Sequence, residues 1–278
     1  MNAASIVSLG RWLVFLAAAL VLNFPILSTL ITSLKSDAEI ASNASLIIER
    51  PTLANYSHVF AMADRFDFTR FLENSLIEAS LGALFSIGLA LPAAYAIVRF
   101  RAGENWLLPV IVNLRAIPLI VFSIPIYLMY QRASLLDTRF GLALIFCLVN
   151  LPLVLVLLAN ATQDLPIELD EAARIDGAST WEVIGHVVLP LLRPIIAASA
   201  VLAFIYSWNE FLFGLMLTTS VAVPVTVGAS FFFSASGAGV QWGVAAAVMI
   251  LSVTPPLLLG LAAYRHIGRS MTSGALKG

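Results

Sequence analysis

Residues 164–179 of this chain read Asp-Leu-Pro-Ile-Glu-Leu-Asp-Glu-Ala-Ala-Arg-Ile-Asp-Gly-Ala-Ser, and Leu189-Pro190 closes the same polar stretch. The stretch carries acids, helix signals and turn signals, and long apolar runs lie on both sides of it. A segment with this much local structure between two membrane-spanning runs is more than a plain linker. We expect it to dock onto another protein, the alternative being a solvated connector.

The composition is that of an integral membrane protein. Of the 278 residues, 60% are hydrophobic and only 11% are charged, whereas a typical soluble domain has about 25% charged residues. The net charge of −1 argues against a nucleic-acid partner. The single cysteine, Cys147, lies in an apolar run and is expected to be a small buried hydrophobe.

Six apolar segments are long enough to cross a membrane, since a spanning helix needs about 20 mostly apolar residues. Prolines lie inside several of them, which membrane helices tolerate, and the alternation of β-barrel strands is absent. The sequence therefore predicts an all-α, polytopic membrane helix bundle with six transmembrane helices. The predicted spans are residues 12–34, 79–98, 107–130, 140–163, 194–217 and 242–264.

The placement of Lys and Arg predicts that both termini are cytoplasmic. In this orientation the inner side carries a small excess of basic residues, and Arg99, Arg101, Arg265 and Arg269 adjoin span ends there. The segment 218–241 is uncharged and is expected to be a re-entrant or interfacial piece on the outside.

This topology divides the chain into three regions. Residues 1–34 form the N-terminus and the first transmembrane helix, and residues 35–78 form an external loop with short amphipathic helices. Residues 79–278 form a core of five further transmembrane helices. That core includes the polar elbow 164–190 and a cytoplasmic C-terminal tail, 265–278.

Local signals predict that the elbow is a helix–turn–helix. Pro166 suits the first turn of a helix, and the acids after it favour a helix N-terminus. Asp176-Gly177 supplies a stop, because glycine readily takes the left-handed conformation beyond a helix end. Ser179 and Glu182 fit a capping box for a second short helix, and Pro190 is expected to end it.

The first helix of the elbow has the features of a docking knob. Ala172 and Ala173 leave a surface that a partner can approach closely, and Glu171 would reach a basic residue of that partner. Asp170 and Arg174 are four residues apart and are expected to pair with each other.

The spacing of these residues resembles that of a known family. Glu171-Ala172-Ala173, then Asp176-Gly177, then Leu189-Pro190 resemble the EAA loop of permease subunits of bacterial ATP-binding-cassette importers. Asn74-Ser75-Leu76, Ser207-Trp208-Asn209-Glu210-Phe211 and the C-terminal residues 271–278 agree with this resemblance. The chain is most similar in these motifs to the smaller, maltose-type permease of the carbohydrate-uptake subfamily.

The resemblance implies a set of partners and a coupling site. The partners are a second homologous permease, two ATP-binding-cassette ATPase subunits and an extracytoplasmic solute-binding protein, assembled in the bacterial inner membrane. The ATPase subunits would bind ATP and Mg, and this chain would bind no cofactor. The implied ATPase contacts are Glu171, Ala172, Ala173, Asp176, Gly177, Leu189 and Pro190.

No catalytic chemistry is evident in the sequence. Glycines near the C-terminus approach the spacing of a phosphate-binding loop, but Ala275 stands where that loop requires lysine. His58, His186 and His266 lack the spacing of metal ligands. We therefore expect a transport subunit without a nucleotide site, a catalytic residue or a metal.

Polar groups in the fifth predicted span suggest a path for the solute. Charged side chains deep in a bilayer are costly and usually mark a function or a buried pair. Tyr206, Trp208, Asn209 and Glu210 would give such a path an aromatic face and groups that bind hydroxyls. The alternative is that Glu210 and its neighbours only hold helices together.

Two other function classes are weighed against the importer subunit. An ion- or proton-coupled transporter without ATPases would need a relay of intramembrane carboxylates, for which Glu210 is the clear candidate in the sequence. A membrane scaffold or receptor would leave both Glu210 and the elbow without a role. Co-purification of an ATPase subunit would separate these classes.

Overall fold

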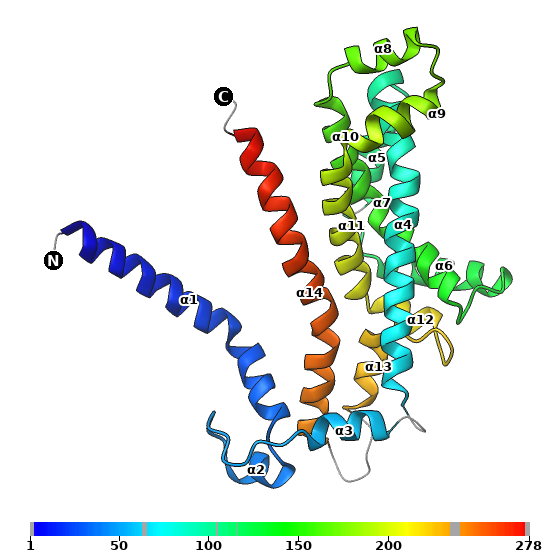
Figure 1. Cartoon of the computed structure of the whole chain (residues 1–278). Helices are drawn as coiled ribbons and strands as arrows, with labels where there is room; N and C mark the ends of the chain where they lie inside the picture. The colour runs from blue at the N-terminus through cyan, green and yellow to red at the C-terminus, as the bar shows by residue number, and fades with distance from the viewer. Residues whose placement is uncertain (1–2, 63–65, 104, 115, 234–239, 276–278) are drawn as a thin grey trace. The chain divides into compact units, whose positions relative to one another are not determined.

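The computed structural model is helical through most of the chain that it describes, residues 3–62, 66–103, 105–114, 116–233 and 240–275 (Figure 1). Within these residues, four helices contain segments that are long and apolar enough to span a membrane. They are α1 (Ala3–Ser33), α4 (Phe68–Phe100), α7 (Arg139–Gln163) and α14 (Trp242–Ala275). The first, second, fourth and sixth predicted spans therefore correspond to long helices.

The third and fifth predicted spans are each divided. Residues 107–130 fall into α5 (Leu107–Leu114) and α6 (Ile120–Arg132), because Pro118 lacks an amide donor and disfavours helix in the residue before it. Residues 194–217 fall into α11 (Arg193–Trp208) and α12 (Leu212–Leu217). Neither α5 nor α6 alone has the length of a span, so the number of six transmembrane helices stays a prediction, as does the orientation of the termini.

The remaining helices are short and connect or cap the long ones. The segment between α1 and α4 holds α2 (Asp37–Ser42) and α3 (Ala54–Ala61), and α4 begins at Phe68, well before residue 79. Segment 218–241 holds α13 (Val225–Phe231), and residues 234–239 lie outside the described part. The elbow holds α8 (Glu168–Ile175), α9 (Thr180–Val183), a π-helical turn (Ile184–Val188) and α10 (Leu189–Leu191).

The chain forms two compact units. The first comprises Met1–Thr69 and Ala229–Thr254. In it the buried side chain of Asn55 donates to the carbonyls of Ser33 and Lys35, both at 2.8 Å, so α3 is tied to the end of α1. The Tyr56 hydroxyl adds a 2.8 Å hydrogen bond to the Ser33 hydroxyl.

The second unit, Arg70–Gly228 with Pro255–Gly278, holds the elbow and the polar residues of the fifth predicted span. In it α4 and α7 approach closely where Gly82 faces Phe146. The Asn150 side chain of α7 donates to the Ser207 hydroxyl of α11 at 2.7 Å. Small residues and buried polar bonds of this kind are how helices associate in lipid, where apolar side chains gain little by leaving the solvent.

A pair of glycines on α4 tests this packing. A Cβ added at Gly82 would lie 2.6 Å from the Cβ of Phe146, whereas a Cβ at Gly88 would meet nothing within 4 Å. Gly82→Ala should therefore lower the thermal unfolding midpoint, since overpacking costs about 1–3 kcal/mol. Gly88→Ala should leave the midpoint unchanged or raise it, because alanine favours a helix by about 0.5–1 kcal/mol. Equal midpoints for the two purified variants would contradict the close approach of α4 and α7.

Candidate functional site

The turn of the elbow is built around Gly177, as the sequence predicts. Gly177 has a φ of +89°, in the left-handed region that favours glycine. The amide of Ala178 donates to the carbonyl of Ala173 at 3.0 Å, and the amide of Gly177 donates to that of Arg174 at 3.1 Å. These two bonds form a Schellman motif, which satisfies carbonyls left free at the end of α8.

The second helix of the elbow begins with the predicted capping box. The Ser179 amide donates to the Glu182 carboxylate at 2.7 Å, and the Glu182 amide donates to the Ser179 hydroxyl at 3.4 Å. Two amides that have no partner within the helix are satisfied in this way. The start of α9 is therefore determined locally.

That helix ends one residue beyond the predicted end at Pro190, and the chain then turns into the fifth predicted span. Helical structure continues through the π-helical turn into α10, which contains Leu189 and Pro190. The chain turns by 81° between Leu191 and Arg193. The π-helical turn lies directly before Pro190, where a regular α-helix would clash with the proline ring.

The elbow presents acidic and apolar side chains to solvent. Glu171, Ala172, Asp176 and Gly177 are exposed, Ala173 is half-buried, and Leu189 is 38% exposed. Ile175 is 86% exposed and Trp181 is 72% exposed. The sequence motif did not single out these two large side chains, although their place on either side of Gly177 suits a contact with another protein.

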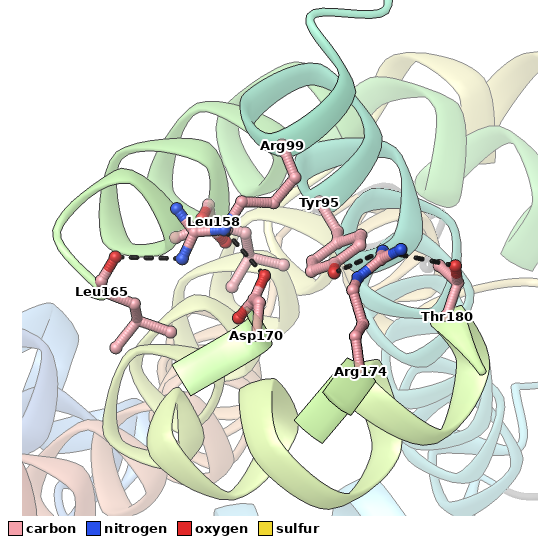
Figure 2. A network of polar contacts seen from close by, with 8 residues as sticks. Tyr95, Arg99, Leu158, Leu165, Asp170, Arg174 and Thr180 are labelled. Atoms are coloured by element: carbon pink, nitrogen blue, oxygen red, sulfur yellow. Dashed lines mark hydrogen bonds and ion pairs between the residues drawn. The ribbon is translucent and has the colours of Figure 1, made fainter. Parts of the chain in front are cut away.

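Two arginines fasten the elbow to the end of α4, as Figure 2 shows. Arg99 of α4 donates through Nε to the Asp170 carboxylate at 2.9 Å and through a terminal nitrogen to the Leu165 carbonyl at 2.9 Å. The side chains of Arg99 and Asp170 are 8% and 6% exposed. Burial of this kind requires that each charge be paired and hydrogen-bonded.

The second arginine belongs to the elbow and contacts side chains of α4. Arg174 of α8 donates to the Tyr95 hydroxyl at 3.4 Å and to the Thr180 hydroxyl at 3.5 Å. Its guanidinium also lies 5.5 Å from the centre of the Phe100 ring. Asp170 and Arg174 thus take partners on α4, where the sequence predicted a pair within α8. We name the contacts of Tyr95, Arg99 and Phe100 with Leu165, Asp170 and Arg174 the elbow clasp.

A second feature is a cavity of about 480 Å³ beside α11. Tyr206, Asn209 and Glu210 line it, so the structure brings together three of the four residues suggested for a solute path. Trp208 does not line it, because this side chain is 3% exposed and stacks on Phe204 with ring centres 5.5 Å apart. The other lining residues are Leu119, Leu153, Leu202, Ile205 and Phe211.

Glu210 has a structural partner of its own. Its carboxylate accepts from the amides of Phe213, at 3.0 and 3.2 Å, and Gly214, at 3.3 Å. These amides belong to the first turn of α12, where a negative charge is favourable. The alternative of a structural role for Glu210 is therefore the one that its hydrogen bonds favour.

Glu78 is a buried carboxylate that the sequence analysis missed. It lies one residue before the second predicted span, but α4 extends past it and its side chain is fully buried. Neither carboxylate oxygen has a hydrogen-bond partner among the described residues. Because Glu78 stands next to the predicted end of a span, the sequence did not mark it as buried, since a charge at a helix end normally reaches water.

The Arg99–Asp170 pair generates a stability prediction. Removing one partner of a buried pair typically costs about 3–5 kcal/mol, because the other charge stays buried, whereas an apolar replacement of both is often neutral. Arg99→Met and Asp170→Leu should each lower the unfolding midpoint, and the double variant should recover most of the loss. A double-mutant cycle on purified protein measures this. Additive losses would show that the two side chains do not interact.

Comparisons with known proteins agree with this geometry. The family model described as "Binding-protein-dependent transport system inner membrane component" matches residues 86–273. A probable ABC transporter permease of Sinorhizobium fredii is 33% identical over 93% of this chain and 92% of its own. A trehalose/maltose transport system permease of Thermococcus litoralis is 32% identical over 94% and 93%.

The fold has also been seen in a solved structure. A chain of a bacterial ABC transporter that imports the polysaccharide alginate superposes with a TM-score of 0.78 at 22% identity, over 95% of this chain and 98% of that one. Its likeness concerns the fold, while the family match covers the elbow and the long helices around it. The chain belongs to the family of inner membrane components of binding-protein-dependent transport systems.

Proposed function

We propose that this chain is the transmembrane permease subunit of an ATP-driven, binding-protein-dependent importer of carbohydrates. The observation that carries the proposal is the exposed elbow, a folded helix–turn–helix that is fastened to a long apolar helix by buried charges. The relative in Thermococcus litoralis is named for trehalose and maltose transport, which supports a saccharide as the solute. The absence of a recognisable phosphate-binding loop in the sequence supports hydrolysis by another subunit.

The proposed assembly contains a second homologous permease, two ATP-binding-cassette ATPase subunits and an extracytoplasmic solute-binding protein. The ATPase subunits hold ATP and Mg. The divided third and fifth spans, α5 with α6 and α11 with α12, would complete six transmembrane crossings with both termini cytoplasmic. The bilayer and the second permease would cover the apolar side chains that are exposed along α1.

The proposed mechanism is alternating access driven through the elbow. Closure of the ATPase dimer moves the two elbows of the permease pair, and the bundle exchanges an inward-facing for an outward-facing state. The elbow must bind the two ATPase states with different affinities, because equal affinities would shift no equilibrium. Glu171 is positioned to be the polar anchor, since its side chain is exposed on α8.

The cavity beside α11 is the proposed contact with the solute. Tyr206 supplies an aromatic face and Asn209 an exposed amide, groups that bind sugar rings and their hydroxyls. In this assignment Glu210 holds the α11–α12 corner in place and Trp208 supports it from within.

The geometry of the elbow predicts how a variant at Gly177 behaves. Gly177→Val should reduce the amount of ATPase subunit that co-purifies with this chain by about 5–30-fold, because a left-handed conformation costs an L-residue about 1–2 kcal/mol. Gly185→Val is the matched control, since Gly185 has no positive φ and an added Cβ meets nothing within 4 Å. Deletion of residues 165–188 should abolish co-purification. Retention of the ATPase subunit by the deletion variant would contradict the proposed function.

Two variants at the cavity are expected to affect different properties, one the solute selectivity and the other the thermal stability. Asn209→Ala should change which saccharides are taken up with little effect on thermal stability, because Asn209 is exposed and, among the described residues, its side chain bonds only the Ile205 carbonyl of its own helix. Glu210→Ala should lower stability by about 1–3 kcal/mol, since the amides at the start of α12 lose their acceptor. Uptake from a saccharide mixture and the unfolding midpoint measure these effects. Altered selectivity with an unchanged midpoint in Glu210→Ala would place Glu210 on the solute path instead.

A further inference from the structure

The end of α4 far from the elbow is also fastened by buried polar contacts. The buried side chain of Asn74 donates to the carbonyls of Val221 and Val223, both at 2.9 Å. The buried hydroxyl of Ser75 accepts from the amide of Val225 at 2.7 Å. Adjacent residues of α4 therefore hold both sides of a loop that is about 150 residues away in sequence.

The tip of that loop encloses the carboxylate of Asp137. Asp137 lies between α6 and α7 with a φ of +55°, and its amide donates to the Leu217 carbonyl at 2.7 Å. Its carboxylate accepts from four consecutive backbone amides, those of residues 219–222, at 3.0 to 3.2 Å. The hydroxyls of Thr219 and Ser220 add bonds of 2.9 and 3.0 Å.

These donors keep Asp137 charged. Burial raises the pKa of the Asp137 carboxyl, but the amides of Ala222, Thr219 and Val221 together lower it by more, so its pKa lies below its ordinary value. A lowered pKa in the folded protein means that the contact is fully present above the ordinary aspartate pKa of about 3.9 and weakens only in stronger acid. The Asp137 carboxyl group is therefore charged at neutral pH.

Arg139 joins the two sets of contacts. It donates through Nε to the Asn74 side-chain oxygen at 2.7 Å, and its guanidinium lies 3.1 Å from the Glu73 carboxylate. Because Arg139 begins α7, the start of α4, the start of α7 and the loop are tied into one polar cluster. We name this cluster, formed by Asn74, Ser75, Asp137 and Arg139 with residues 219–225, the distal clasp.

The two clasps lie towards opposite ends of α4, which continues as one helix through Pro92 between them. Figure 1 shows α8 and α9 at one end of α4 and α12 near the other. The 33 residues of α4 make it about 50 Å long, more than the hydrocarbon core of about 30 Å. Between the clasps, Gly82 lets α4 pack directly on α7, so the helix has a close neighbour along its course.

We propose that α4 is a strut, so that the elbow and the loop 219–225 move as one body when the importer changes state. In this proposal Asp137 is a positioning residue, because it holds the loop to α4 without contacting solute or nucleotide. The strut rests on the proposed function for the force at the elbow. It adds that residues 219–221, which are exposed, carry the state of the ATPases to the opposite side of the membrane.

The test measures one distance in two states of the assembled importer. Spin labels at Val221→Cys, on the exposed tip of the loop, and Glu168→Cys, on the exposed start of α8, report the distance between the two ends. The buried native thiol is removed by Cys147→Ala. Double electron–electron resonance is recorded without nucleotide and after trapping with Mg, ATP and vanadate. The strut predicts the same distance in both states.

A clasp variant and a matched control complete the experiment. Asp137→Ala should broaden the distance distribution and make its mean differ between the two states. Asp37→Ala removes the same charge from an exposed position in the other unit and should leave the distribution unchanged. A shift of the distance between states with the clasps intact would overturn the proposal, even if Asp137→Ala fails to fold. Identical distributions for the two alanine variants would also overturn it.

The experiment distinguishes a failure of the strut from a failure of the proposed function. Co-purification of ATPase subunits and vanadate-sensitive ATP hydrolysis are established first on the same labelled sample. A sample that hydrolyses ATP, but in which the distance between the two labels changes with the state, contradicts the strut alone. A sample without ATPase subunits contradicts the proposed function.

Discussion

The buried ion pair between Arg99 and Asp170 fastens the elbow to α4, and the proposed coupling depends on it. An arginine and an aspartate that are almost closed to solvent stabilise the fold only when paired, because each charge loses its water on burial. The elbow is therefore held to α4 by buried contacts. A force applied to the elbow by a partner would be passed to a helix that is long enough to cross the membrane.

The rest of the second unit follows the same rule, that polar groups are placed where they have partners. Asn150 reaches Ser207 between α7 and α11, Glu210 caps α12, and Asp137 lies in a ring of amides. Such bonds fix the packing of helices whose apolar surfaces alone would slide in lipid. Among the described residues, the buried polar side-chain atoms without a hydrogen-bond partner are the two carboxylate oxygens of Glu78, the side-chain oxygen of Asn150 and the hydroxyl of Ser199.

Local features could be predicted from the sequence, and contacts between distant residues could not. The capping box of Ser179 and Glu182 and the left-handed Gly177 depend on residues within one turn of each other, so their patterns are visible in the chain. The long helices α1, α4, α7 and α14 follow from apolar length alone. The family and the exposed part of the elbow followed from a motif with fixed spacing.

The partners of Asp170, Asp137 and Glu210 could not be predicted from the sequence, and the reason differs for each. Asp170 had an apparent partner in Arg174, and nothing in the spacing shows that Arg99 of another helix is closer. The amides that bind Asp137 are backbone groups, which leave no mark in a sequence. The break between α11 and α12 at Glu210 lies inside an apolar run with no proline or glycine at that point, so the run was interpreted as one span.

In the proposed function this chain transmits a movement and supplies no energy for it. The most direct measurement is uptake from a defined saccharide mixture, followed by mass spectrometry, into sealed vesicles that contain this chain, its partner permease and the binding protein. The account predicts accumulation only when the ATPase subunits and ATP are also present. Accumulation driven by a pH gradient in vesicles without any ATPase subunit would contradict it.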